Sequence, residues 1–126
     1  MVYQKETKSS IEDIRTSIEH KAKKVGFGVL GSYEFKKILK SKGYEIEKDI
    51  TVFELCNPPA AQKALVLYPE VSVYLPCRLS VYQEGDVVIL ATIHIDDIVT
   101  SLDIEGNLKL YLEEIFEKMK QLINDL

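Results

Sequence analysis

Apolar and polar residues alternate most regularly between Val71 and Tyr82. The odd-numbered positions of this stretch are apolar, while most even-numbered positions are polar or aromatic. Because a strand turns successive side chains to opposite faces, the alternation predicts one long strand with an apolar face. The run from Val87 to Ile95 is expected to pair with it, since Gly85 lies in a short turn between the two runs. Together the two runs predict a β-hairpin.

The length of this turn decides which side chains share a face of the hairpin. A three-residue turn, Glu84 to Asp86, pairs Gln83 with Val87 and sets apolar residues opposite apolar residues. A two-residue turn instead mixes apolar and polar partners along the two strands. The pattern therefore favours the three-residue turn, which places the even-numbered residues of both strands on one outward face.

Two helices are expected in the first third of the chain. Ser9 and Glu12 form a capping box, in which Ser9 is the N-cap and Glu12 reaches back to it. The helix that follows should stop at Gly26, since glycine tolerates the left-handed conformation that ends many helices. A shorter helix is expected to begin at a Ser32 cap and to end at Gly43.

Two more helices are expected in the rest of the chain. Asn57 is a suitable N-cap and Pro58 suits the first helical position. That helix should end near Tyr68, because the residue before Pro69 is pushed out of the helical region. The last helix runs from Asn107 to Asp125, with apolar residues three and four positions apart, and should lie across the sheet.

The remaining segments complete a prediction of the fold class. Strands are expected at Val2 to Glu6, Phe27 to Leu30 and Ile50 to Cys56, and a connecting loop formed by Asp96, Asp97 and the stretch Thr100 to Gly106. A chain of 126 residues has the usual length of one domain, here residues 1–126. The order of elements predicts an α+β two-layer sandwich, with a mainly antiparallel sheet and helices on one face.

Composition excludes several classes of protein. With 46% hydrophobic residues the chain is not intrinsically disordered. It has no apolar run long enough to cross a membrane, and its first residues lack the apolar core of a signal peptide, so we expect a cytoplasmic protein with no membrane partner. Its net charge of −4 argues against a nucleic-acid partner, because such domains usually display a basic face. Lysine outnumbers arginine 14 to 2, a bias found in proteins from hot environments and equally in those from AT-rich genomes.

The outward face of the predicted hairpin is the first candidate site. Its apolar residues Val88 and Leu90 lie among aromatic and polar ones, and a bare sheet face is usually more polar than this. Such a mixture is typical of a subunit interface or a ligand platform. We therefore expect a homodimer that binds a small molecule or a protein partner through this face. The candidate ligand-binding residues are Tyr74, Arg78, Tyr82, Thr92 and His94.

Arg78 is one of only two arginines in the chain. Its guanidinium could bind a carboxylate or a phosphate through two parallel hydrogen bonds. The alternative is an ion pair within the protein, with an acid such as Asp96.

The two cysteines suggest a second hypothesis, a thiol-dependent enzyme or a sulfur- or metal-handling protein. Cys56 precedes the Asn57 cap, and the positive end of a helix dipole lowers the pKa of a thiol. A buried strand cysteine is the alternative for Cys56, and Cys77 is expected to point into the core as a small hydrophobic residue. Both should be free thiols in a reducing compartment. We find no motif for a metal or cofactor, so none is expected.

Three segments together resemble the signature of a bacterial and archaeal family, the domain of unknown function 302. They are Phe27-Gly28-Val29, Leu55-Cys56-Asn57-Pro58 with Ala61 after it, and Leu75-Pro76-Cys77-Arg78-Leu79. The resemblance is clearest over residues 3 to 96. It implies a fold like one half of the TATA-binding protein, a curved antiparallel sheet with helices on one side, and a tendency to form homodimers. It names no activity. The family's short helix commonly opens on an acidic residue, whereas here Ser32 is expected at its cap.

Overall fold

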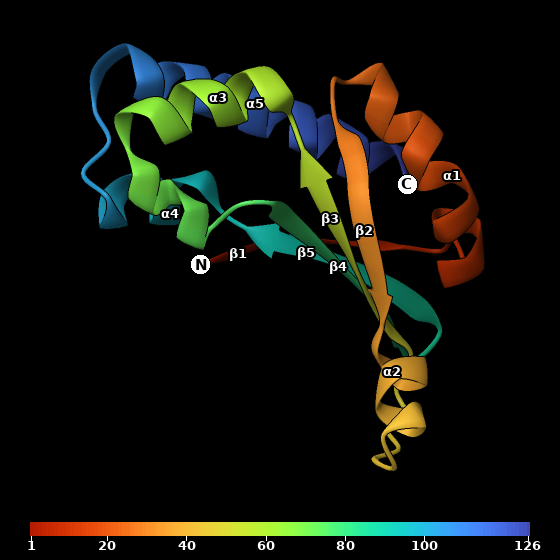
Figure 1. The fold of residues 1–126 in the computed structure, drawn as a ribbon. Coiled ribbons are helices and arrows are strands. Elements are labelled where there is room, and N and C mark those ends of the chain that lie inside the picture. The colour runs from red at the N-terminus through yellow and green to blue at the C-terminus, as the bar shows by residue number, and fades with distance from the viewer.

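The sheet of the computed structural model, which describes residues 1–126, has five strands, and every neighbouring pair is antiparallel (Figure 1). The strand β4 lies at its centre, and β1 and β2 form its two edges. In spatial order the strands are β1 (Val2–Thr7), β5 (Val87–Ile93), β4 (Cys77–Glu84), β3 (Ile50–Cys56) and β2 (Gly28–Glu34).

Helices cover one face of this sheet and leave the other bare (Figure 1). The covering helices are α1 (Ile11–Lys24), α3 (Pro58–Leu67), α4 (Ile95–Ser101) and α5 (Gly106–Asp125). The short helix α2 (Phe35–Ser41) lies apart, beyond one end of β2. The predicted α+β two-layer architecture is therefore confirmed. None of the helices combines the length and the apolar content that crossing a bilayer would require.

Helix α1 is capped one residue later than predicted. Its N-cap is Ser10 rather than Ser9, and the Ser10 hydroxyl accepts a hydrogen bond of 3.0 Å from the Asp13 amide. At the other end Gly26 has a φ of +86°, and the Phe27 amide donates to the Ala22 carbonyl. This left-handed residue ends the helix as expected and turns the chain into β2.

The strand β2 is longer than predicted. It runs through Ser32, which pairs with Phe53 of β3, and so Ser32 is not a helix cap. Helix α2 opens instead after Glu34, an acidic residue, as the resemblance implies for the family. The Glu34 carboxylate caps no backbone amide and lies 3.3 Å from the guanidinium of Arg15.

The prediction is wrong for the first half of the long strand. Residues Pro69–Val73 form a short 3₁₀ helix, η1, and β4 begins only at Cys77. The strand β3 turns into α3 after Cys56, so the residues before Cys77 have no neighbouring strand to pair with. Pro76 also has no N–H to donate to a ladder.

The predicted register of the hairpin is wrong by one residue. Glu84 pairs with Val87 across a two-residue turn, in which Gly85 has a φ of +61°. As a result Val88, Leu90 and Thr92 face the helices, while Ile89 and Ala91 lie on the bare face. All five of these residues are buried, so β5 has no polar side to mark its register. The strand β4 keeps its predicted orientation, with Leu79 and Val81 fully buried under the helices.

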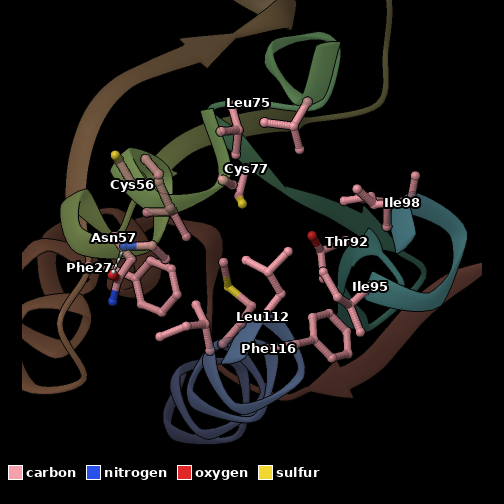
Figure 2. Close-up of a pocket in the computed structure, with 18 residues that line it drawn as sticks. Phe27, Cys56, Asn57, Leu75, Cys77, Thr92, Ile95, Ile98, Leu112 and Phe116 are labelled. Atoms are coloured by element: carbon pink, nitrogen blue, oxygen red, sulfur yellow. Dashed lines mark hydrogen bonds between the residues drawn. The ribbon is translucent and has the colours of Figure 1, made fainter. Parts of the chain in front are cut away.

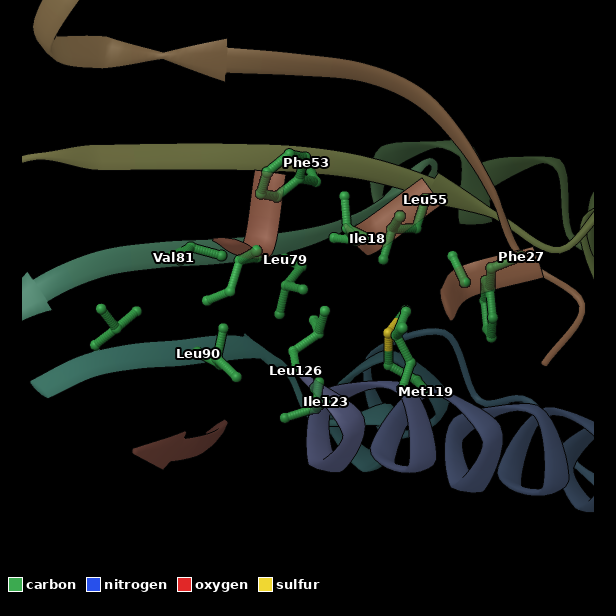
Figure 3. Close-up of a cluster of buried hydrophobic side chains, with 14 of the residues drawn as sticks. Ile18, Phe27, Phe53, Leu55, Leu79, Val81, Leu90, Met119, Ile123 and Leu126 are labelled. Carbon is green, nitrogen blue, oxygen red and sulfur yellow. The ribbon is translucent and has the colours of Figure 1, made fainter. Parts of the chain in front are cut away.

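The core consists of two clusters of buried side chains. The first core cluster joins α1 and the C-terminal half of α5 to the sheet, and Figure 3 shows Leu79 and Leu90 facing Ile123 of α5 and Leu126, which follows this helix. The second core cluster joins α3, η1, α4 and the N-terminal half of α5. Ile95 and Ile115 pack against both. The packing is interrupted where the two clusters meet.

Candidate functional site

A cavity of about 80 Å³ lies between the sheet and helices α3, α4 and α5, where the two core clusters meet (Figure 2). Sixteen of its 18 lining residues are hydrophobic, so its surface is almost entirely apolar. It is partly open to solvent, and Ile93 in its wall is 37% exposed. An engineered apolar cavity of about 150 Å³ binds benzene or xenon, so the present volume suits a smaller group.

The sequence of α3 explains why the space is unfilled. The Asn57 side chain accepts a hydrogen bond of 3.0 Å from the Ala60 amide, and Pro58 occupies the first helical position. This start turns Ala60 and Ala64, one helical turn apart, toward the core, and both are buried. Ala61 also lines the cavity. Alanine side chains fill less of the space between α3, the sheet and α5 than larger residues would.

The opposite walls come from the sheet and from two further helices. Leu55 and Cys77 from neighbouring strands and Thr92 from β5 form the sheet side. Helix α4 adds Ile95 and Ile98, and α5 adds the residues around Phe116 (Figure 2). All three segments that carry the family resemblance therefore contribute to this one cavity, through Phe27, Leu55 to Asn57 with Ala61, and Leu75 with Cys77.

The Cys77 sulfur points into the cavity (Figure 2). Burial, with a smaller contribution from the neighbouring Cys56, raises the pKa of the Cys77 thiol to about 11. At neutral pH the thiol is therefore uncharged. This shift is opposite to the one that a thiolate nucleophile needs.

The side-chain oxygens of the two polar residues in the wall, Thr92 and Asn57, already have partners. The Thr92 hydroxyl is buried and donates a hydrogen bond of 2.8 Å to the Arg78 carbonyl. The Asn57 carbonyl oxygen caps α3, as described above. Almost no polar atom reaches the surface of the cavity, which therefore presents no charge.

The thiol hypothesis gains no support from this arrangement. Both cysteines are free, and the Cys56 sulfur is directed away from that of Cys77 (Figure 2). At the α3 N-terminus, whose dipole was expected to act on Cys56, the Ala60 amide donates its hydrogen bond to the Asn57 side chain. Nowhere do three or more His, Cys, Asp or Glu residues gather in a way that could hold a metal ion.

The five predicted ligand-binding residues do not lie together. Arg78 and Tyr82 are on the bare face of the sheet, as expected, but Thr92 faces the helices because of the register of β5. Tyr74 follows η1, and its hydroxyl lies 2.8 Å from that of Ser101. His94 ends β5 and caps α4. The predicted single platform is therefore wrong as a geometric group.

His94, which was predicted to lie in the strand, is the N-cap of α4, a helix that replaces the end of that strand and part of the predicted loop. Its Nδ1 accepts a hydrogen bond of 3.1 Å from the Asp96 amide, and its ring lies 4.8 Å from that of Phe116 between centroids. Ile98 and Val99 of α4 are buried in the second core cluster. This burial stabilises a helix that the local sequence does not predict.

Arg78 pairs weakly with an acid, although with Glu54 rather than Asp96. Its Nε lies 4.0 Å from the Glu54 carboxylate, and its side chain is largely exposed. The other oxygen of Glu54 accepts a hydrogen bond of 2.7 Å from the Tyr33 hydroxyl. This bond and the negative charge of Glu54 raise the pKa of Tyr33.

Sequence reasoning missed the cavity itself. The one local signal for it is the group of three alanines at positions 60, 61 and 64, directly after a strong helix start. Short side chains on the inner face of a helix leave space, but only the positions of the other walls show whether that space is filled.

Comparison with known proteins agrees with the fold. The family model for the domain of unknown function DUF302 matches residues 3–126. Among solved structures, the chain is similar to that of an uncharacterized conserved DUF302 protein from Bacillus stearothermophilus, with a TM-score of 0.88 and 24% identity over 98% of this chain and 95% of that one. At that identity the likeness shows the fold alone. No curated protein matches the chain.

Proposed function

The chain belongs to the DUF302 family, and we propose that it is a binding module that holds a small apolar group in the cavity between its sheet and helices α3, α4 and α5. The observation that carries this proposal is the cavity. It has a nearly uniform apolar wall, it opens to solvent, and the three segments that carry the family resemblance all contribute to it.

The energetics of packing support the same proposal. Leaving about 80 Å³ of apolar space empty costs the folded protein about 2 kcal/mol, at roughly 24 cal/mol per Å³. A bound apolar group recovers the lost contacts, since it supplies partner atoms to side chains that otherwise face a void. The cavity therefore combines a cost to stability with a gain on binding.

Filling the cavity from α3 tests the proposal. Crystals of the wild-type protein under xenon pressure are expected to hold xenon in the cavity, since xenon enters apolar spaces of this kind. Ala64→Leu places a larger side chain in the cavity and is expected to abolish that density. Gln62→Leu, which adds the same side chain on the exposed side of α3, should leave it unchanged. A wild-type crystal without xenon, or equal occupancy in Ala64→Leu, would contradict the proposal.

A second candidate function is self-association through the bare face of the sheet. That face carries Ile89 and Ala91 on β5, which their neighbours leave only 6% and 8% exposed, and the partly exposed Val52 and Tyr82 on the other strands. It is richer in apolar residues than an exposed face usually is. No helix covers it in Figure 1, and a second copy of the chain would supply an identical apolar face.

Light scattering after size exclusion tests the dimer. The wild-type protein is expected to have twice the 14.4 kDa mass of the chain. Ser80 lies on the bare face of the central strand, opposite Ala91, so Ser80→Lys would bury a charge in the interface and should yield a monomer. Ser72→Lys, at an exposed position on η1, is the matched control and should remain dimeric. A monomeric wild-type protein would exclude this candidate.

A further inference from the structure

We infer that the cavity takes the end of a short hydrocarbon chain from a water-soluble molecule, whose polar group stays outside. This inference rests on the proposed function, because it names the ligand class of the same cavity. It follows from three properties of the wall, namely its size, its lack of charge and the state of its polar groups.

The size of the cavity limits how much of a ligand it can enclose. A cavity of about 150 Å³ takes the six carbons of benzene, so about 80 Å³ holds roughly three carbons. The rest of a larger ligand must extend through the opening to solvent. A long lipid chain would leave most of its apolar surface in water, so a short-chain soluble molecule fits better.

The chemistry of the wall decides which end of the ligand enters. The Cys77 thiol is neutral, and Thr92 already uses its hydroxyl hydrogen on the Arg78 carbonyl. Almost no polar atom reaches the surface of the cavity, so a carboxylate, an ammonium or a hydroxyl group inside it would give up its water without gaining a strong partner. The methyl end of a chain loses nothing by the same transfer.

A series of linear 1-alkanols tests the inference, with binding followed by NMR shifts of the residues that line the cavity. Affinity is expected to rise about fourfold for each added CH₂ group. The rise should level off once roughly three carbons fill the cavity, because further carbons remain in water. In Ala64→Leu the rise is expected to be absent.

The orientation of the chain is tested by a second polar end. 1,4-Butanediol should bind about 10- to 100-fold more weakly than 1-butanol, because a hydroxyl group must then enter the cavity. Cys77→Ser places a hydroxyl in the wall and is expected to recover about tenfold of this difference. Val66→Thr is the control, since Val66 is exposed on α3 and does not line the cavity, and it should recover nothing.

The outcomes separate this inference from the proposed function. If neither xenon nor any alkanol enters the cavity, the proposed function fails. If alkanols bind but the diol binds equally well, or if affinity keeps rising with chain length, the cavity is a ligand site of another class and the inference alone fails. Cosedimentation with phosphatidylcholine vesicles that Ala64→Leu abolishes would assign the site to a membrane lipid and would also overturn it.

Discussion

Replacing Arg15 by alanine is expected to lower the free energy of unfolding by about 2 to 3 kcal/mol. Its guanidinium donates a hydrogen bond of 2.7 Å to the hydroxyl of Thr51, which is fully buried, and lies 3.2 Å from Asp49 and 3.3 Å from Glu34. Arg15 thereby ties α1 to β3 and to the end of β2. Without it the buried hydroxyl loses its donor and two carboxylates lose their shared cation.

The other arginine of the chain is the control for this prediction. Arg78 is largely exposed, and its Nε lies 4.0 Å from Glu54, so Arg78→Ala should change the stability by no more than about 0.5 kcal/mol. Urea unfolding of both variants measures the difference, and the dependence on denaturant should stay the same. Equal stabilities of the two variants would show that the contacts of Arg15 contribute nothing.

The two arginines also show what the sequence could reveal about function. Arg78 was predicted to bind a ligand because apolar and polar residues alternate clearly along its strand and place it on the outward face. Arg15 has one local partner, Glu12 on the same helix, but its other partners come from positions 34, 49 and 51. No local spacing connects these residues, so their meeting depends on the packing of α1 against the sheet.

Element boundaries were predictable where one residue determines the local backbone. Gly26 and Gly43 end helices in a left-handed conformation, with φ values of +86° and +87°. Asn57 and Pro58 start α3 as expected, and β3 covers the predicted residues. In each case the signal is carried by residues next to each other in the chain.

The register of β5 and the existence of α4 could not be predicted in this way. A strand buried on both faces has no alternation, so the hydrophobic pattern could not choose between two turn lengths. Helix α4 has Asp96 and Asp97, residues typical of loops, in its first turn, and it depends on the burial of Ile98 and Val99. Both errors arise from contacts between distant segments, and both displaced the candidate site.

The cavity could not be predicted from the sequence, for a related reason. Its volume results from the short side chains of α3. The distance of this helix from α5 is fixed by both core clusters. The prediction that Cys77 behaves as a small hydrophobic residue agrees with its raised pKa. The positions of the other walls are needed to see that Cys77 lines an open space rather than a packed core.

Between pH 9 and pH 11, the free energy of unfolding of the wild-type protein is expected to fall by about 2 to 3 kcal/mol more than that of a Cys77→Ala variant. The pKa of the thiol rises on folding from an ordinary value of 9.0 to about 11. Above pH 9 the unfolded chain therefore releases this proton while the folded chain keeps it, and deprotonation favours unfolding. A shift of two units corresponds to about 2.7 kcal/mol, fully present as stability below pH 9 and lost as the pH approaches 11.

Comparison of variants isolates the thiol from the other groups that titrate in this range. Lysine and tyrosine side chains change charge between pH 9 and pH 11 in every variant, so the difference between urea unfolding curves, in reducing buffer, reports Cys77 alone. Cys56→Ala keeps the burial of Cys77, which is the larger cause of the shift, and should retain most of the loss. If wild type and Cys77→Ala lose stability in parallel, the thiol titrates normally. The wall of the cavity would then be polar enough to accept a charged group, and a hydrocarbon ligand would lose its main physical argument.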